Sequence, residues 1–128
     1  GGGLSQGFIN DPVFTVLGKA LDAYSLRHKA AAENIANANT PGYKRSYVPF
    51  EDELARVLEE GGGEEEVSRL QPKALQDRLT QAREDGNNVD MEQEVAEMAK
   101  NSLRYQAASS VLRTRFAMYR YVISEGKR

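Results

Sequence analysis

The 128-residue sequence contains no cysteine and no tryptophan, and its only histidine is His28. The absence of cysteine excludes a disulfide framework, a thiolate nucleophile and cysteine-based zinc or iron–sulfur sites. A single histidine argues against a histidine-rich metal centre and a conventional catalytic triad. No apolar run approaches the roughly 20 residues that cross a bilayer, and no basic-then-apolar start marks a cleavable signal peptide.

Large apolar residues are also scarce. Leu, Ile, Val and Phe together make up 27 residues of the chain. This share, about 21%, lies just above the level at which composition indicates disorder. A chain of this length forms one domain at most, or two elements that need partners, so we do not expect a large private core.

The N-terminal part carries an apolar stripe that predicts a helix over residues 11–40. Asp11 and Pro12 supply an N-cap and a first helical residue, and Asn39 to Gly42 supply the stop. Steps of three and four residues along this segment are typical of a coiled-coil seam. The stripe comprises Phe14, Leu17, Leu21, Tyr24, His28, Ala31, Ile35 and Ala38.

The C-terminal part carries a second stripe and predicts a helix over residues 90–125, with Asp90 and Gln93 as a capping box and Gly126 as terminator. We therefore expect an all-α fold, in which long N- and C-terminal helices form an antiparallel coiled-coil-like hairpin. The second seam comprises Met91, Val95, Met98, Ser102, Tyr105, Ser109, Leu112, Phe116, Tyr119 and Ile123.

Residues 41–89 show no comparable period, and we expect an irregular, partly disordered middle segment. Residues 51–66 carry a net charge of −7 and a triple glycine, which indicates a solvated stretch. Short helices are predicted around Phe50–Leu58 and Leu75–Ala82, and an extended segment at 47–50. Residues 100–128 carry a net charge of +6. Residues 1–10, which begin with three glycines, are interpreted as a disordered start or a cloning remnant.

No pattern of catalytic or ligand-binding residues is present. Carboxylates are plentiful, but none is paired around a pocket and no nucleophile sits beside a base, so we expect neither an enzyme nor a cofactor. The acidic stretches lack the spacing of a calcium loop, and the triple glycine lacks the Lys of a phosphate-binding loop. His28 has two interpretations: a pH-sensitive contact or, preferably, a partly buried interface residue.

The segment 31–44, AAENIANANTPGYK, resembles the N-terminal signature of bacterial flagellar axial proteins, the rod and hook family. Asn34 and Asn37 lie on one helix face next to the seam. Because Asn is a poor helix former, we expect their amides to meet specific partners. The resemblance implies an assembly motif, which comprises Asn34, Asn37, Asn39, Thr40, Pro41, Gly42 and Tyr43.

Residues 85–91, DGNNVDM, and 98–106, MAKNSLRYQ, resemble the proximal rod proteins within that family. The resemblance covers residues 14–50 and 85–124, and Glu33 is a minor departure from it. It implies a structural subunit whose terminal helices pack beside those of neighbours into a hollow helical tube. It also implies a place in the periplasmic rod of the basal body, reached by type III export without signal cleavage.

The implied partners are copies of the chain, other rod subunits, a rod-adaptor protein, and components of the export gate and membrane ring. No nucleic acid or small-molecule substrate is expected. Two alternatives stay open at this point: a coiled-coil adaptor or export chaperone, and a nucleic-acid binder that uses the basic C-terminal helix. In the second, basic residues spread along the helix would contact phosphates, although DNA-reading helices usually concentrate them in a short block.

Overall fold

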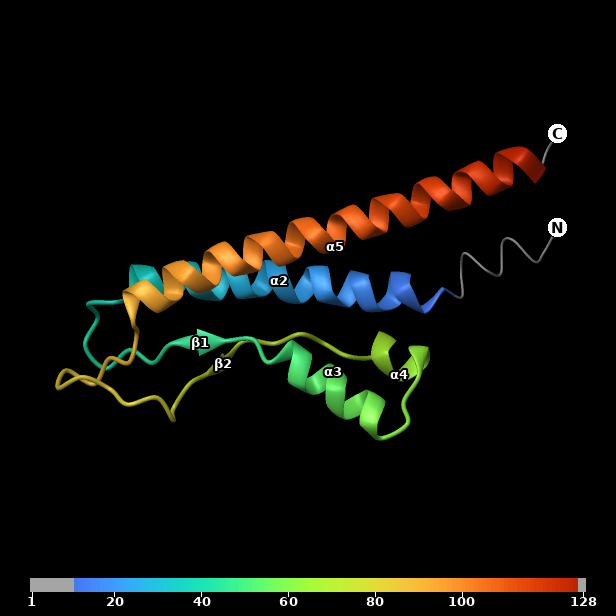
Figure 1. Cartoon of the computed structure of the whole chain (residues 1–128). Helices are drawn as coiled ribbons and strands as arrows, with labels where there is room; N and C mark the ends of the chain where they lie inside the picture. The colour runs from blue at the N-terminus through green and yellow to red at the C-terminus, as the bar shows by residue number, and fades with distance from the viewer. Residues whose placement is uncertain (1–10, 127–128) are drawn as a thin grey trace.

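A computed structural model describes residues 11–126 of the chain (Figure 1). The prediction for residues 1–10 concerns residues outside this range. Two long helices dominate the molecule, and shorter elements connect them. The elements in chain order are α2 (Pro12–Ala36), β1 (Ser46–Tyr47), α3 (Phe50–Glu59), α4 (Glu64–Ser68), β2 (Leu75–Gln76) and α5 (Met91–Gly126). No helix within 11–126 is both long enough and apolar enough to cross a membrane.

Helix α2 begins at the expected signal and ends earlier than expected. The Asp11 carboxylate accepts a hydrogen bond from the Val13 N–H at 3.0 Å, and Pro12 is the first helical residue. Asn37 is the C-cap, and its side chain donates to the Glu33 carbonyl at 2.9 Å. The remaining residues to 42 form turns, where Gly42 adopts a φ of 76°. Local capping by Asn37 thus ends the helix before Pro41 is reached.

Helix α5 packs along one side of α2. The Phe14 and Phe116 rings meet edge to face, with centroids 4.9 Å apart. Further along α2, the Tyr24 carbonyl accepts a hydrogen bond from the Asn101 side chain at 2.7 Å. Asp11 accepts from Tyr119 at 2.9 Å and pairs with Arg115 at 3.2 Å. The contacts of Asp11 and Phe14 join the start of α2 to the C-terminal half of α5.

The side chains buried along both long helices are small or polar. They are Ala20, Ala23, Ala30, Ala31 and Asn34 in α2, and Glu94, Asn101 and Ala108 in α5. The buried line in α5 repeats every seven residues, one residue before the predicted heptad of Val95, Ser102 and Ser109. One residue is a rotation of about 100° around a helix, so the predicted seam is displaced toward the edge of the contact.

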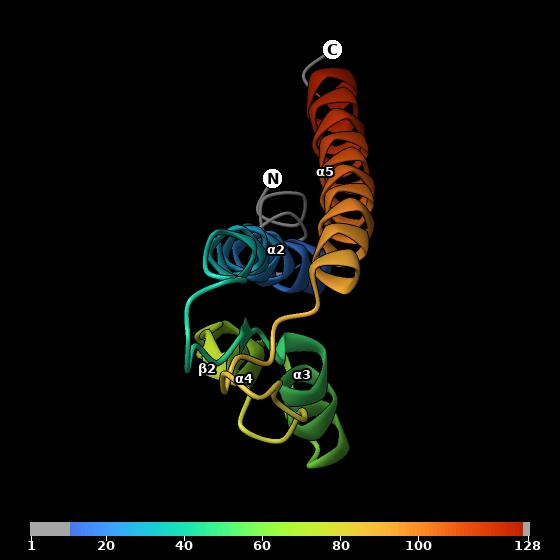
Figure 2. The same cartoon turned by 90° about the vertical axis from the view of Figure 1, so that its left-hand side faces the viewer.

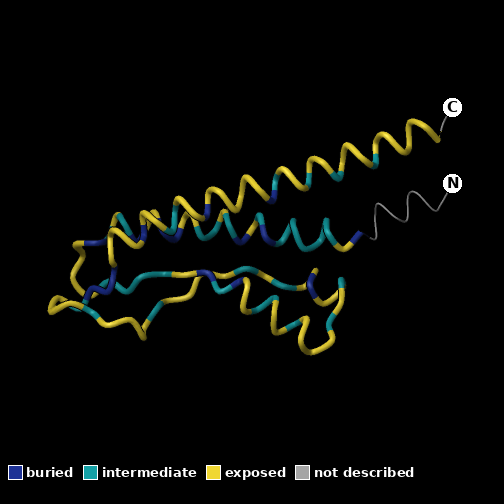
Figure 3. The backbone as a smooth tube through the Cα atoms, viewed as in Figure 1, coloured by how far each residue is buried: buried dark blue, intermediate teal, exposed yellow. Residues whose placement is uncertain are grey.

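The large residues of that seam are accordingly not the most deeply buried ones. On α2, Phe14, Leu17, Leu21, Tyr24 and Ile35 are half-buried. On α5, Met98, Leu112 and Tyr119 are half-buried, whereas Val95, Tyr105, Phe116 and Ile123 are exposed. In α5, small or polar side chains occupy the buried line, and the larger ones lie beside it. Figure 3 shows that most of α5 is exposed.

The middle segment covers a different side of α2, so that α2 lies between α5 and the shorter elements (Figures 1 and 2). Val48 and Phe50 form the core with Ala20, Ala23 and Ala30 of α2. Half-buried side chains pack around this core, namely Tyr24, Leu26, Leu54 and Leu70.

Two expectations about the middle segment need correction. The helix predicted around Leu75–Ala82 does not form: Leu75 pairs with Tyr47 in a short antiparallel ladder, and no helix follows before α5. The acidic stretch at 51–66, for which composition indicates partial disorder, contains α3 and α4. Acidic residues in the first turn stabilise each of these helices through the helix dipole. Arg27 and Thr15 of α2 donate hydrogen bonds to Glu51 and Glu64, respectively, each at 2.9 Å.

Enlarging a buried alanine of α2 tests the close packing. We expect Ala23→Leu to lower the free energy of unfolding by about 1–3 kcal/mol, because the added atoms meet a filled core. Urea denaturation followed by circular dichroism measures this. The matched change Ala32→Leu, on the exposed side of the same helix, should leave the midpoint nearly unchanged. Equal midpoints for the two variants would contradict the packing described here.

Candidate functional site

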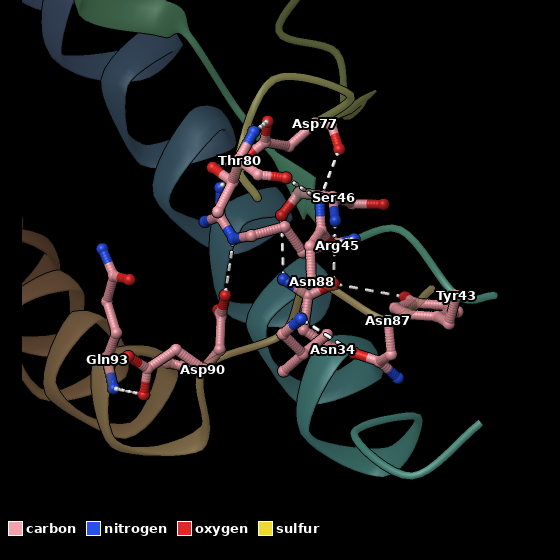
Figure 4. A network of polar contacts seen from close by, with 12 residues as sticks. Asn34, Tyr43, Arg45, Ser46, Asp77, Thr80, Asn87, Asn88, Asp90 and Gln93 are labelled. Carbon is pink, nitrogen blue, oxygen red and sulfur yellow. Dashed lines mark hydrogen bonds and ion pairs between the residues drawn. The ribbon is translucent and has the colours of Figure 1, made fainter. Parts of the chain in front are cut away.

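The two segments that carry the family resemblance lie against each other. The turn after α2 and the loop before α5 exchange main-chain hydrogen bonds: Gly42 N–H donates to the Asp85 carbonyl at 2.8 Å, and Asn88 N–H donates to the Tyr43 carbonyl at 3.3 Å. Lys44 Nζ donates to the Gly86 carbonyl. Two motifs more than 40 residues apart in the sequence therefore form one structural unit, part of which is shown in Figure 4.

Asn87 connects this loop to the end of α2. Its side chain is fully buried, and Nδ2 donates to the carbonyls of Asn37 and Thr40, each at 2.9 Å. Its Oδ1 accepts from the Val89 N–H at 2.8 Å. The Asn37 and Thr40 carbonyls also accept from the N–H groups of Thr40 and Tyr43, at 3.0 and 3.2 Å. The buried Asn87 amide thus adds a second bond to each carbonyl and attaches the loop to the turn.

Asn34 makes the corresponding contact on the other side of the turn. Its Oδ1 accepts from the Ser46 N–H at 2.8 Å and from the Tyr43 hydroxyl at 3.2 Å, and its Nδ2 donates to the Ser46 carbonyl at 2.9 Å. The amide thus pairs with Ser46 as a neighbouring strand would (Figure 4). Burial is the main cause that raises the pKa of Tyr43 above its ordinary value.

Asn88 and a buried ion pair hold Arg45 against the loop before α5 and against α5 itself. Asn88 accepts from the Arg45 N–H and donates to the Asp77 carbonyl, both at 2.7 Å. The Arg45 side chain binds Glu94 at 2.7 Å and Asp77 at 3.0 Å. Burial lowers the pKa of Arg45, but the two carboxylates outweigh burial and raise it. Glu94 is only 2% exposed, so Arg45 supplies the charge that a buried carboxylate requires.

Asp77 organises the next turn of the chain. It accepts from the Thr80 hydroxyl at 2.6 Å and from the N–H groups of Thr80 and Leu79, each at 3.0 Å. These bonds, the Thr80 hydroxyl first, hold the pKa of Asp77 well below its ordinary value of 3.8. The carboxylate is therefore a fixed negative charge beside Arg45.

Glycine is required where the two motifs touch. Gly86 has a φ of 84°, and a Cβ at this position would stand 3.3 Å from the Gly42 Cα. Few L-residues adopt such a φ, and few Cβ atoms come that close to a neighbouring backbone. The pair of glycines therefore sets the distance between the turn and the loop.

The residues of the predicted assembly motif have different positions. Asn34 is buried and Tyr43 half-buried, while Asn39 and the residues 40–42 are exposed. Asn37 caps its own helix and accepts from the Thr40 hydroxyl at 3.1 Å. The specific groups that the Asn34 and Asn37 amides bind are backbone atoms of the same chain. His28, for which a partly buried position is preferred above, is exposed.

Several residues that anchor the site are not predicted from the sequence. They are Asn87, Asn88, Asp77 and Arg83, and the Arg83 guanidinium donates to the carbonyls of Val89 and Ala38, each at 2.6 Å. One feature of the sequence could have pointed to them: Asn87 and Asn88 are adjacent and lie in the segment 85–91 that resembles the family. Within residues 11–126, no three His, Cys, Asp or Glu side chains are grouped as metal ligands. The interactions at the site join chain segments to one another.

Removing the Asn87 amide tests the contact between the motifs. We expect Asn87→Ala to lower the free energy of unfolding by about 1–3 kcal/mol, because the buried Val89 N–H loses its acceptor and the loop loses both bonds to the turn. Asn39→Ala, an exposed position of the adjoining turn, is the matched control and should change it little. Thermal and urea denaturation measure both. A cost for Asn39→Ala as large as that for Asn87→Ala would refute the assignment.

Asp77 gives the site a defined acid response. Its pKa is lower in the folded chain than in the unfolded chain, so the stability it confers is present above 3.8 and is lost as the pH falls through and below that value. We expect Asp77→Asn to be less stable than the unaltered chain near neutral pH. The difference between the two should narrow as the pH is lowered from about 5 to about 2. Urea midpoints across this range measure it, and a constant difference would contradict the role of the carboxylate.

Comparison with known proteins agrees with this arrangement. The family model "Flagella basal body rod protein" matches residues 14–44, which comprise α2 and the following turn. The chain is 32% identical over 120 residues to "Flagellar basal body rod protein FlgB" of Borrelia hermsii, a match that covers 80% of this chain and 89% of the relative.

Proteins of the same name give similar matches in two enteric bacteria. The chain is 34% identical over 110 residues to the protein of Escherichia coli (strain K12) and 36% identical over 110 residues to that of Salmonella typhimurium. Each match covers 73% of this chain and 80% of the relative. These matches give no support to an adaptor, chaperone or nucleic-acid binder. The chain belongs to the family of the flagellar basal body rod protein FlgB.

Proposed function

We propose that this rod subunit assembles through an antiparallel, coiled-coil-like hairpin of α2 and α5. Two contacts support the arrangement: Phe14 lies against Phe116, whereas Tyr24, later in α2, lies against Asn101, earlier in α5. In an assembled rod such hairpins stand side by side and form the wall of a hollow helical tube. The activity of the protein is structural, and its family is not one of enzymes.

The observation that carries the proposal is the apolar surface that α5 leaves exposed. One stripe faces away from α2 and includes Leu103, Val111, Met118 and Tyr121. The predicted seam adds Val95 and other exposed residues along another edge of the same helix. A helix with apolar residues on several sides is normally covered on those sides, so neighbouring subunits are the expected cover.

The motif residues have an indirect part in assembly. Asn34, Asn37 and Tyr43 hold the turn after α2, and the exposed residues Asn39 to Gly42 form its surface. We assign three functional regions to the chain: an N-terminal axial region at 11–40, which contains α2 and the turn after it, a middle segment at 41–89 and a C-terminal axial helix at 90–125. The site fixes the direction in which the middle segment leaves the axial helices.

The partners proposed for this surface are copies of the chain, other rod subunits and the rod-adaptor protein, with the export gate and membrane ring at the base. The family resemblance supports these partners, a position in the periplasmic rod, and type III export without a cleaved signal peptide. Charge adds a second argument, because residues 51–66 carry −7 and residues 100–128 carry +6. Opposite charges on separate parts of one chain favour contacts between neighbouring subunits.

Charged substitutions on the outward stripe test the proposal. We expect Val111→Glu combined with Met118→Glu to leave the urea midpoint of the isolated chain nearly unchanged, because both side chains are exposed. The same variant should fail to restore motility in a bacterium that lacks its own FlgB and that the unaltered chain complements. Gln71→Glu in the exposed middle segment is the control and should restore motility. Full motility of the double variant would contradict an assembly role for this surface.

A further inference from the structure

Helix α3 carries two carboxylates that have no partner in their own chain. Asp52 and Glu59 are exposed and lie seven residues apart, on the side of α3 opposite the buried Phe50. Their side chains make no hydrogen bond or ion pair within residues 11–126. Glu59 is the last residue of α3, where a negative charge is unfavourable because of the helix dipole. The pair is therefore suited to positive charges outside the chain.

Helix α5 carries a pair of opposite charge with the same spacing. Arg113 and Arg120 are exposed, also lie seven residues apart, and have no hydrogen bond or ion pair in the part of the chain that the structure describes. A helix rises 1.5 Å per residue, so each pair spans about 10.5 Å. Because the two spacings match, both ion pairs can form at once when α3 of one copy lies along α5 of another.

An apolar surface adjoins each charged pair. On α3, Leu58 directly precedes Glu59 and is 52% exposed. On α5, a shallow apolar hollow directly follows the basic residues, and no charged group lines it. The residues of this α5 hollow are Thr114, Ala117, Met118, Tyr121 and Val122. An exposed leucine on one surface and an uncovered hollow on the other are complementary in shape and polarity.

These positions determine the relative direction of the two helices. Leu58 comes one residue before Glu59, whereas Tyr121 comes one residue after Arg120. One residue is a rotation of about 100° around a helix. When two facing helices run in the same direction, these two positions lie on the same side of the contact. Leu58 then reaches the α5 hollow, whereas antiparallel helices would place it on the opposite side.

The contact requires two copies of the chain. Figures 1 and 2 show the last turns of α5 above α2 and α3 below it. The net charges of the two surfaces remain opposite when all their residues are included. Residues 50–60 contain five acidic residues and a single basic one, Arg56. Glu125, one turn after the hollow, is the single acidic residue of the basic segment 100–128.

We propose that α3 of a second copy lies along α5 in the same direction and inserts Leu58 into the α5 hollow. Asp52 of the second copy then pairs with Arg113. Glu59 pairs with Arg120, two turns further on. The contact joins two different surfaces, and repetition of such a heterologous contact builds an open helical assembly. The proposal rests on the assembly function above and identifies one pair of surfaces that performs it.

A disulfide between copies tests the geometry, since the chain has no cysteine of its own. A copy with Leu58→Cys should form a dimer on oxidation with a copy of different mass that has Met118→Cys, in the α5 hollow. Leu103→Cys, exposed on the same stripe of α5 but fifteen residues earlier, is the control and should give little mixed dimer. Equal yields with both partners, or none with Met118→Cys, would overturn the proposal.

Charge exchange tests the ion pairs. Arg113→Glu with Arg120→Glu, made in the copy with the cysteine in the hollow, should slow formation of the mixed dimer about fivefold, because two attractive pairs become repulsive. Asp52→Lys with Glu59→Lys in the other copy should restore the rate, since the charges are then complementary again. All four positions are exposed, so the circular dichroism spectra should stay unchanged. An unchanged rate, or a loss without recovery, would contradict the pairing.

The proposed function fails separately from this inference. If the unaltered chain restores motility and the cross-link shows no preference for Met118→Cys, the contact is wrong and the rod function stands. If the unaltered chain does not restore motility although the cross-link forms and follows the charge exchange, the contact stands and the rod function is contradicted.

Discussion

The hydrogen bonds from Asn87 to the carbonyls of Asn37 and Thr40 are the interaction on which the rest of the structure depends. They attach the loop before α5 to the end of α2 and thereby close a segment of about 50 residues. Asn34 fixes the start of that segment through Ser46, and Arg45 joins the same part of the segment to α5 through Glu94. Because α5 begins directly after this loop, the same contacts determine where α5 starts along α2. The site is therefore a folding element that positions the two long helices relative to each other.

Few side chains of α5 are buried, and this leaves most of the helix exposed. Ala108 is buried and occupies little volume, whereas Leu103, Val111 and Met118 of the same helix are exposed. A subunit built in this way has a thin core of its own and a long helix that is incompletely covered. Both properties suit a protein that reaches its final environment among neighbours, where the exposed apolar area is removed from water.

The sequence predicted where the long helices begin better than it predicted which side of each helix is buried. Asp11, Pro12 and Asp90 have local capping roles, so the starts of both long helices could be read directly. The face of α5 could not, because a heptad of apolar residues does not tell whether its partner lies in the same chain or in another. The anchors of the site were also hidden: Asn87 acts on carbonyls 47 and 50 residues away, and Glu51 and Glu64 bind α2 despite an acidic composition. Contacts between residues so far apart in the sequence produce no periodic pattern of residue types.

Hydrogen–deuterium exchange of the dilute full chain, read by mass spectrometry or NMR, tests the central claim most directly. The account predicts that the amides of Ser46, Arg45 and Val89, which donate to Asn34, Asn88 and Asn87, exchange slowly and together, because they report one cooperative unit. The last turns of α5, exposed on most sides, should exchange faster. In Asn87→Ala the protection of all three amides should fall together. Fast exchange at these amides in the unaltered chain, or loss confined to Val89 in the variant, would contradict the account.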